Sequence, residues 1–548
     1  MKKRSIVVHN DRRIYVVEES LDDDYEVERE LNNFASLIKV PEGIHTYELD
    51  EYSLWSSAAL GLKYEDIISF LQDNSRNIVS DKIKIYIKNK IKEFWTIKLK
   101  YVSDNKVILE ANDNRTIKEL LIKIRYGKEV ELAKAQISII SINEIIAVLE
   151  YKDIYSLKEF LINSSFFINE IIESIKEIKV KVNVDLFDYQ IDAVNSFISG
   201  NKGMTIGRGV ISMPPGSGKT LVGLKIIESL KVKTLVLVEN KESFSCWLDE
   251  LEDKTNLAEK SKSLIKYNEL NSIISIITYR AAQELLDKIK SECWGLIIYD
   301  DAHKLPGPKS KVLGYIQSKY KLALGSILKR EDNKHYIIYK AVGPKIYNLT
   351  LRELEIRGIQ IQVICTEIKT PRNYWDFEER ENEKELLKEA KNQNKIEIYK
   401  LLEEKHKNSK IVLVSTYREI ANKFHDIIDN SILIDGKINP SNRKALVEEY
   451  NSKNVGKLIV SELLEKLQVN NIDVIIALSY IGKSEREEYL RIGKLKSSNL
   501  YKNKLGYYYA LVSENTCEEM VFKKRSQDMV KHGYKFKIRY YGNSNKGI

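Results

Sequence analysis

The stretch that decides the fold is Ile211-Ser212-Met213-Pro214-Pro215-Gly216-Ser217-Gly218-Lys219-Thr220. An apolar run leads into Gly-Ser-Gly-Lys-Thr, and apolar residues at helical spacing follow from Leu221 to Leu230. Gly216 and Gly218 have no Cβ, so the backbone is free to curl and to direct its N–H groups at an anion. The N-terminus of the following helix adds partial positive charge. The stretch therefore predicts a phosphate-binding loop between a strand and a helix.

Each residue type in this loop has an expected role. Lys219 would reach the terminal phosphates of a nucleotide, the Thr220 hydroxyl would hold Mg²⁺, and Gly216, Ser217 and Gly218 would supply the backbone cradle. One residue departs from the general pattern, because Met213 stands where glycine is usual. The alternative is a chance glycine-rich turn, which the strand before it and the helix after it disfavour.

Length and composition narrow the class of protein. A chain of 548 residues is too long for one core and predicts about three or four domains. A net charge of +9 is mildly basic, so it allows a polyanionic partner without requiring one. The four cysteines lack metal-ligand spacing and favour a reducing compartment. The apolar stretch near the start ends at Val8, too short for a signal peptide, and no run suits a membrane span, so we expect no membrane partner.

Changes in the apolar pattern divide the chain into five segments. We expect a strand and helix module at 1–92, a small mixed domain at 93–180, alternating strands and helices at 181–370, a charged helical insertion or linker at 371–408, and a second alternating set at 409–548. Alternation of this kind predicts α/β domains with parallel sheets.

The second segment begins with a predicted hairpin, in which the strands Trp95–Val102 and Lys106–Glu110 flank a polar turn. Residues 137–178 are apolar, and we expect them to be mostly helical.

Two aspartates complete a predicted nucleotide site. An apolar strand ends at Asp300-Asp301-Ala302-His303, and ligands of parallel sheets sit at the carboxyl ends of the strands. Mg²⁺ requires few carboxylates when water and phosphate oxygens complete its shell, so Asp300 is placed to hold it. Asp301 would orient the attacking water, since phosphoryl transfer depends on positioning. The alternative is a pair of solvated acids at a strand end.

These residues resemble a known family. The aspartates with His303 resemble the Asp-Glu-x-His motif of superfamily 2 helicases, and Gln190 resembles the glutamine that reads adenine there. Arg330-Glu331-Asp332 resembles the R-E-D element of XPB helicases, and Tyr47 to Leu62 resembles a helical segment of their eukaryotic branch. The matches run in the same order from about residue 40 to 540.

The resemblance implies two RecA-like parallel-sheet domains and an ATP-driven 3′-to-5′ DNA helicase or translocase that uses ATP and Mg²⁺. It further implies a nuclear subunit of TFIIH that acts with DNA and other TFIIH subunits in promoter opening and nucleotide excision repair. The domain at 93–180 would correspond to the family's damage-recognition domain, and a thumb-like insertion would fall near 371–395.

The first helicase domain is nearly complete against the family pattern, whereas the second is not. The T-A-T element aligns with Gly325-Ser326-Ile327, which keeps one hydroxyl, and little remains of another element at Leu464–Val469. The arginine motif reads Leu490-Arg491-Ile492-Gly493-Lys494-Leu495-Lys496-Ser497, so only Arg491 is retained as a catalytic arginine. Loss of an arginine finger can lower the rate by ~10³-fold.

Three hypotheses follow from these departures. The chain is a working translocase, or a mainly structural TFIIH subunit that binds ATP, or a related helicase outside TFIIH.

DNA contacts are expected at strand and loop ends of the first helicase domain. Thr278 and Tyr279 match a motif that faces the DNA backbone in the superfamily, where a hydroxyl would suit a phosphate. Arg330, Glu331 and Asp332 would extend the same surface. Trp247 occupies the position of a family tryptophan, and we expect core packing there rather than a DNA contact.

Overall fold

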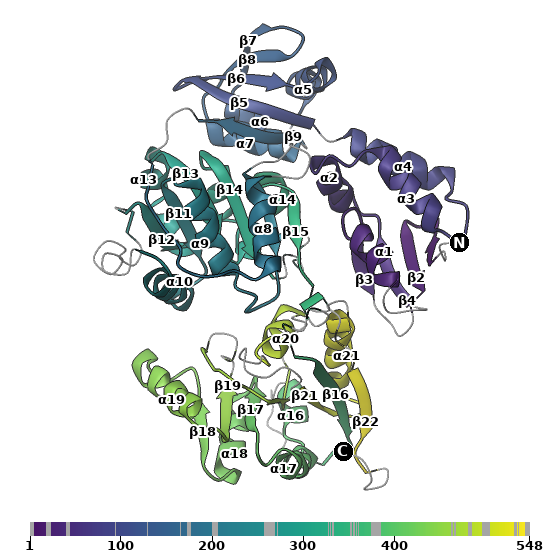
Figure 1. Cartoon of the computed structure of the whole chain (residues 1–548), viewed down its shortest axis with the longest axis vertical. Helices are drawn as coiled ribbons and strands as arrows, with labels where there is room; N and C mark the ends of the chain where they lie inside the picture. Colours follow the sequence, from purple (N-terminus) through teal and green to yellow (C-terminus); the bar gives the residue numbers. More distant parts are fainter. Residues whose placement is uncertain are drawn as a thin grey trace. The chain divides into compact units, whose positions relative to one another are not determined.

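The computed structural model describes most of the chain, and its secondary structure falls into four sheets with their helices (Figure 1). The described residues are 5–17, 23–39, 44–93, 95–128, 130–164, 166–172, 177–199, 207–256, 269–270, 272–326, 328, 330, 332, 334–350, 353–354, 357, 359, 361–373, 385–461, 464, 467–480, 485–495, 505–530, 534 and 536–542.

The first module is a four-stranded sheet with helices. Its strands run in the order β1-β2-β4-β3, and β2 pairs antiparallel with both β1 and β4. Alternation of buried and exposed residues along β2 matches a sheet with one covered face. Its elements are β1 (Ile6–Val8), β2 (Arg13–Val17), α1 (Asp23–Leu31), β3 (Ser36–Lys39), β4 (Ile44–Glu48), α2 (Glu51–Ala59), α3 (Tyr64–Asn74) and α4 (Asp81–Lys92).

The second module is a five-stranded mixed sheet in the order β7-β8-β6-β5-β9. The predicted hairpin is confirmed as β5 (Trp95–Ser103) and β6 (Lys106–Ala111). The prediction that 137–178 is mostly helical is wrong, because β7 (Ser138–Ile142), β8 (Ile146–Glu150) and β9 (Phe166–Ile171) enclose one helix, α7 (Ile154–Asn163). Short apolar runs do not separate strand from helix when no polar period is present. The remaining helices are α5 (Asn114–Tyr126) and α6 (Val130–Ala135).

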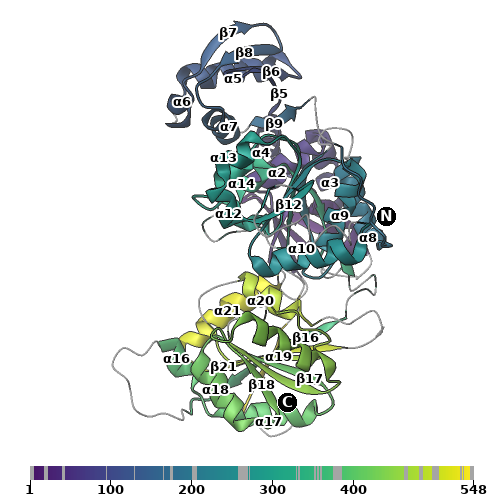
Figure 2. The same ribbon diagram turned by 90° about the vertical axis from the view of Figure 1, so that its left-hand side faces the viewer.

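The third module is a six-stranded parallel sheet in the order β12-β11-β13-β14-β10-β15. Figure 2 shows helices α12, α13 and α14 on one side of this sheet and α8 and α9 on the other. Fully buried strands such as β13 read as continuous apolar runs because both faces are covered.

The strands of this sheet are β10 (Arg208–Ser212), β11 (Thr234–Val238), β12 (Ile274–Thr278), β13 (Trp294–Tyr299), β14 (Ser318–Gly325) and β15 (Lys345–Asn348). Its helices are α8 (Asp188–Ile198), α9 (Lys219–Leu230), α10 (Lys241–Lys254), α12 (Tyr279–Glu284), α13 (Leu286–Ser291) and α14 (Tyr336–Ala341), with 3₁₀ turns η1 (Ala302–Lys304) and η2 (Lys311–Tyr315). These three modules form one compact unit.

A second compact unit holds a seven-stranded parallel sheet in the order β18-β19-β17-β20-β21-β16-β22. Its strands are β16 (Val363–Thr370), β17 (Lys410–Ser415), β18 (Ser431–Ile434), β19 (Gly456–Ser461), β20 (Val474–Ala477), β21 (Gly506–Ser513) and β22 (Phe536–Tyr540). Its helices are α16 (Glu385–Ala390), α17 (Asn394–Lys405), α18 (Arg418–Ile427), α19 (Pro440–Ser452), α20 (Glu485–Ile492) and α21 (Cys517–Val530). The expected α/β class with two parallel-sheet domains is confirmed.

Two expected boundaries of this unit are corrected. β16 lies within 181–370 of the sequence, yet it pairs with β21 and β22, so the second unit begins near Thr350. Part of the 371–408 segment belongs to the second parallel-sheet domain, because α17 buries Ile398 and Leu402 in the core of the seven-stranded sheet. Residues 374–384 lie outside the described part of the chain.

Within the described residues, none of the helices combines the length and the apolar character that crossing a bilayer requires.

Candidate nucleotide site

The phosphate loop joins the end of β10 to the start of α9, as the sequence predicts. Gly216 has a φ of 65° and Gly218, the N-cap of α9, a φ of 81°, which is the left-handed region that glycine adopts without strain. A Cβ on Gly218 would lie 2.3 Å from the Gln190 Nε2. Both the conformation and the close approach therefore require glycine at 218.

Gln190 lies under this loop and contacts it directly. Its buried side-chain amide donates to the Ser217 carbonyl at 2.9 Å, and its Oε1 accepts from the Phe187 N–H at 3.0 Å. The Tyr189 hydroxyl donates to the same Ser217 carbonyl at 3.2 Å. The start of α8 thus supports the loop, and both ends of the Gln190 amide have partners within the chain.

Lys219 lies between the loop and the end of β14. Its Nζ donates to the Ser326 Oγ at 2.9 Å and to the Met213 carbonyl at 3.3 Å. Parallel pairing of Ser212 with Gly325 brings the two segments together. Ser326, the hydroxyl retained in the altered T-A-T element, is therefore a direct neighbour of the phosphate-loop lysine.

Asp300 follows β13 at the same end of the sheet and is held by three neighbours. The Trp247 Nε1–H donates to its Oδ2 at 2.8 Å, the Asp301 N–H to its Oδ1 at 3.0 Å, and the Tyr279 hydroxyl to its backbone carbonyl at 3.0 Å. Burial and the adjacent Asp301 charge raise the pKa of Asp300 to about 6, against the opposing effects of Trp247 and Lys219. Because β13 pairs with β14 and β14 pairs with β10, the strand end that carries Asp300 lies beside those that carry Ser326 and the phosphate loop.

Asp301 has an unusual backbone conformation. Its φ of 48° lies in the left-handed region, which side chains other than glycine seldom adopt outside turns and functional sites. Asp301 is the N-cap of the 3₁₀ turn η1, so the chain changes direction directly after Asp300.

The residues present fit a nucleotide with Mg²⁺. A divalent cation would stabilise the ionised form of a buried carboxyl that has a second acid beside it. Asp300, next to Asp301, is such a carboxyl. Thr220 follows Lys219 in the first turn of α9, so its hydroxyl lies at the same helix N-terminus. The loop glycines and Lys219 supply the matching groups for phosphate.

Trp247 is a site residue that the sequence did not reveal as such. We expect core packing from its position, and it is buried, with an exposed fraction of 1%. The hydrogen bond from its indole to Asp300 gives it a second role in fixing the carboxylate. No local signal connects the two, since they come from α10 and the end of β13.

Thr278 and Tyr279, the expected DNA contacts, have partners within the chain, and their contact with DNA stays a prediction. Both residues are buried, at 6% and 5% exposed. The Thr278 hydroxyl accepts from the Ala281 N–H and so caps α12, whereas the Tyr279 hydroxyl donates to the Asp300 carbonyl. These hydroxyls stabilise the end of the sheet.

Arg330 likewise has partners within the chain. Its guanidinium forms a two-pronged contact with Asp332, at 2.9 Å for each pair, and its Nη1 donates to the His303 carbonyl at 2.5 Å. The pair therefore ties the segment after β14 to the Asp-Asp-Ala-His turn, and a DNA contact at these residues stays a prediction. Glu331 lies outside the described residues.

The altered arginine motif lies in the second unit, where Arg491 is fully buried on α20. Its guanidinium approaches Glu488 at 3.6 Å, and Arg525 binds the same carboxylate at 2.6 Å. Arg491 thus has a buried partner within the second unit, and its catalytic role stays a prediction.

Lys494 stands at the position of a finger arginine in the same motif. Its Nζ donates to the Leu467 carbonyl at 2.7 Å, which gives the cation a structural contact within the unit. Ser497 lies outside the described part of the chain.

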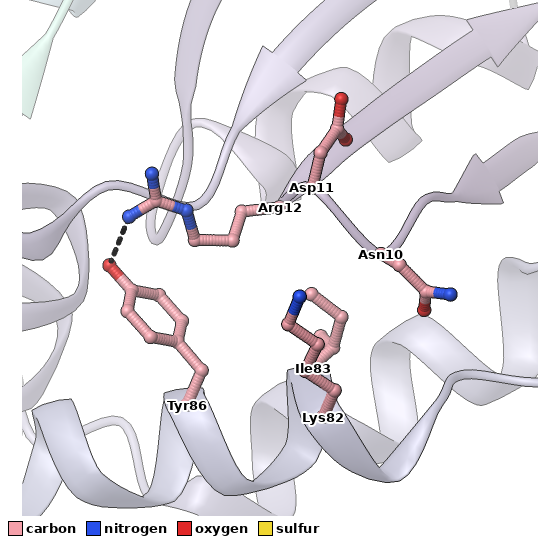
Figure 3. Close-up of a pocket in the computed structure, with 6 residues that line it drawn as sticks. All are labelled: Asn10, Asp11, Arg12, Lys82, Ile83 and Tyr86. Carbon is pink, nitrogen blue, oxygen red and sulfur yellow. Dashed lines mark hydrogen bonds between the residues drawn. The ribbon is translucent and has the colours of Figure 1, made fainter.

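A surface hollow of about 310 Å³ lies elsewhere, in the first module, between the β1–β2 turn and α4 (Figure 3). Arg12 and Tyr86 meet across it, with Nη1 and the hydroxyl 3.4 Å apart. None of the residues proposed for the nucleotide site lines it.

Three family descriptions match successive parts of the chain. Residues 354–545 match the "ERCC3/RAD25/XPB C-terminal helicase" family. Residues 183–330 match "Type III restriction enzyme, res subunit", and residues 6–134 match "Helicase conserved C-terminal domain". The six- and seven-stranded sheets therefore each lie largely within a match.

Similar curated proteins cover nearly the whole chain. "DNA 3'-5' helicase XPB" of Kineococcus radiotolerans is 23% identical over 92% of this chain and 91% of its own. "General transcription and DNA repair factor IIH helicase/translocase subunit XPB" is 26% identical in Enterocytozoon bieneusi (92% of this chain, 87% of its own) and 26% in Danio rerio (91% and 74%).

Among solved structures, Saccharomyces cerevisiae Dbp5 bound to RNA and ADP BeF3 is 12% identical, with a TM-score of 0.47 over 66% of this chain and 91% of that chain. The Pyrococcus furiosus Hef helicase domain is 14% identical, with a TM-score of 0.41 over 58% and 94%.

Proposed function

The chain is a divergent member of the XPB family of helicases, and we propose that it binds ATP with Mg²⁺ at the phosphate loop and hydrolyses it to move along DNA. One observation carries the proposal. Lys219 contacts Ser326, and Asp300 follows the neighbouring strand β13, so all three residues lie at the carboxyl ends of adjacent strands, where a parallel sheet binds its ligand.

Each residue of the site has a task in this proposal. The loop N–H groups and Lys219 bind and orient the terminal phosphates, and Thr220 and Asp300 hold Mg²⁺, which neutralises charge on the phosphate oxygens. Asp301 positions the attacking water. The hydrogen bond from Gln190 to the Ser217 carbonyl holds the loop in its conformation, at the edge of the site where adenine would bind.

A second candidate is an ATP-binding subunit with little hydrolysis, and the arginine motif favours it. Arg491 is buried against Glu488, and the Lys494 amino group is bonded to Leu467, so neither is presented as a free cation for a developing negative charge. Lysine also lacks the planar fork of arginine. We therefore expect slow hydrolysis, with Asp300, Asp301 and Lys219 as the residues that sustain it.

Assembly into TFIIH is part of the proposal. The relatives from Enterocytozoon bieneusi and Danio rerio are named as subunits of that factor, which favours DNA and other TFIIH subunits as partners, a nuclear location, and roles in promoter opening and nucleotide excision repair. The bacterial relative is named as a helicase alone, which favours a helicase outside TFIIH. Purification of the tagged chain from its own cells, with identification of stoichiometric partners, separates the two.

The direct test is ATP turnover with and without duplex DNA. We expect Lys219→Ala to abolish turnover, because the phosphates lose their cation. Lys225→Ala is the matched control, since Lys225 lies on the same helix and pairs with Glu228 at 2.6 Å. Turnover in the Lys219→Ala chain equal to that of the unchanged chain contradicts the proposal. Intact nucleotide binding with no turnover in the unchanged chain favours the second candidate.

A further inference from the structure

A buried cluster of charges lies where the five-stranded module contacts the six-stranded sheet. Glu170 of β9 is surrounded by three cations, Lys158 of α7, Arg208 of β10 and Lys321 of β14. The Glu170 Oε2 is 2.9 Å from Lys158, and its Oε1 is 3.2 Å from Arg208 and 3.3 Å from Lys321. All four residues are at most 3% exposed. At this depth each charge is stabilised by its partners in the cluster and not by water, so removal of one partner leaves an uncompensated buried charge.

The same cations are bonded to the backbone beside β14. Lys158 donates to the Tyr315 carbonyl at 2.9 Å, Lys321 to Gly314 at 2.7 Å, and Arg208 to Ser318 at 2.7 Å. Lys158 thereby reaches from the five-stranded module into the sheet domain, and the Tyr315 side chain joins the apolar core of that module. The contact is thus sealed by apolar packing as well as by charge.

The cluster is also connected to the nucleotide site through two strands. Arg208 and Lys321 are paired neighbours in β10 and β14, and the same register pairs Ser212 with Gly325. The two pairs are four positions apart along the strands, a distance of about 13 Å. Met213 and Ser326 directly follow Ser212 and Gly325. The Met213 carbonyl and the Ser326 hydroxyl accept hydrogen bonds from the Lys219 amino group.

We propose that Glu170 is a positioning residue for the nucleotide site: it fastens the five-stranded module to the starts of β10 and β14 and so holds the register that sets Ser326 and Met213 against Lys219. The inference rests on the proposed nucleotide binding. It follows that the five-stranded module and the six-stranded sheet move as one body, so that force on one is transmitted to the strands behind the phosphate loop.

The charge count makes Glu170 the residue on which the cluster depends. One carboxylate faces three cations, so its loss leaves only like charges in a buried space, whereas loss of one lysine leaves two cations with their counter-ion. Burial lowers the pKa of Lys321 to about 7, and the surrounding cations lower the pKa of Glu170. At Glu170 the three cations outweigh the effect of burial, which alone would raise its pKa, and at Lys321 the other two cations add to the effect of burial.

The test compares Glu170→Gln with Glu159→Gln in the full chain. Glu159 pairs with Lys311 at 2.6 Å across the same contact, but this pair is partly exposed, so its loss has little effect. We expect hydrogen exchange of the β9, β10 and β14 amides to become at least tenfold faster in Glu170→Gln alone, with exchange in the seven-stranded sheet unchanged. Titration with a fluorescent ATP analogue and Mg²⁺ should give at least fivefold weaker binding for the same variant.

Rescue separates positioning from a general loss of structure. Glu170→Gln combined with Lys321→Met removes one unpaired cation and should recover most of the slow exchange and of the analogue affinity. Glu170→Asp keeps the charge, so its hydrogen exchange and its affinity for the analogue should be close to those of the unchanged chain. This variant takes the place of Glu170→Gln in the comparison if Glu170→Gln does not fold. Faster exchange with unchanged analogue affinity overturns the positioning role, and unchanged exchange overturns the attachment itself.

Failure of the proposed function has a different signature. If the unchanged chain does not bind the analogue, nucleotide binding fails and the positioning role fails with it, while the exchange comparison still decides whether Glu170 attaches the module.

Discussion

At the scale of single residues, the contact between Lys219 and Ser326 compensates for an altered motif. The threonine positions of the T-A-T element hold Gly325 and Ile327, yet the Ser326 hydroxyl between them reaches the lysine at 2.9 Å. A hydrogen bond to a charged group contributes about 1.5–3 kcal/mol. The end of β14 therefore keeps one polar link to the phosphate loop.

Removal of this link should affect turnover more than binding. We expect Ser326→Ala to lower the DNA-stimulated kcat roughly tenfold, the equivalent of about 1.4 kcal/mol, with a small change in the KM for ATP. Steady-state kinetics measure both constants, and Ser326→Thr, which keeps the hydroxyl, is the control. An unchanged kcat in Ser326→Ala would show that the hydroxyl has no part in the reaction.

The indole of Trp247 should set the affinity for Mg²⁺. Trp247→Phe removes the hydrogen bond to Asp300 and retains most of the ring volume, so the carboxylate loses the neighbour that lowers its pKa. We expect half-maximal turnover to require several-fold more Mg²⁺, measured by titration at constant ATP. Phe244→Leu on the same helix is the control, and equal Mg²⁺ requirements in the Trp247→Phe and unchanged chains would refute the role.

At the scale of elements, the sequence predicted those strands whose signal is local. β11 and β13 are buried at every position and mostly apolar because helices cover both faces of the sheet. β16 was assigned to the wrong domain because its partner β21 lies far along the chain, and parallel pairing leaves no turn signal. The Glu170 cluster was invisible for the same reason, since its four charges come from four elements.

The residues of the nucleotide site and the arginine motif also differ in whether their signal is local. Lys219, Thr220 and Asp300 follow from motifs because each stands in a fixed local pattern. Burial of Thr278, Tyr279 and Arg491 depends on packing between distant segments, which a single sequence does not record.

The strand pair β10–β14 should gain stability as the pH rises above 7. Folded Lys321 loses its proton near pH 7, whereas in the unfolded chain it keeps the proton up to its ordinary pKa of 10.5. The unfolded state then binds more protons, so the free energy of unfolding increases with pH, by at most about 1.4 kcal/mol per unit.

The measurement is urea unfolding of the unchanged chain and of Lys321→Met at pH 7 and pH 9.5. The groups around Lys321, namely Glu170, Arg208, Lys158, Tyr101 and Tyr299, are common to both chains. The unchanged chain should gain stability relative to Lys321→Met at the higher pH. A constant or reversed difference would contradict the assigned shift.

At the scale of the whole molecule, the two parallel-sheet units have diverged to different degrees. The first unit keeps Lys219, both aspartates and the Ser326 hydroxyl that contacts Lys219. In the second, the Lys494 amino group donates to the Leu467 carbonyl, and Arg491 lies 3.6 Å from Glu488, whose carboxylate also pairs with Arg525. Retained binding with weakened hydrolysis is the expected consequence.

Restoration of the arginine motif should raise the rate. We expect Lys494→Arg with Ser497→Arg to increase DNA-stimulated turnover about tenfold or more, since an arginine finger contributes ~10³-fold where it is fully placed. Lys496→Arg is the control for added guanidinium charge. If the double variant is no faster than the unchanged chain, hydrolysis is limited by something other than the lost fingers.

The most direct test of the account is ATP turnover by the full chain with duplex DNA, measured beside Lys219→Ala. The account predicts slow turnover that DNA increases and that Lys219→Ala abolishes, while Lys225→Ala leaves it unchanged. Nucleotide binding without any turnover above the Lys219→Ala background, with DNA present, would contradict the assignment of a working motor.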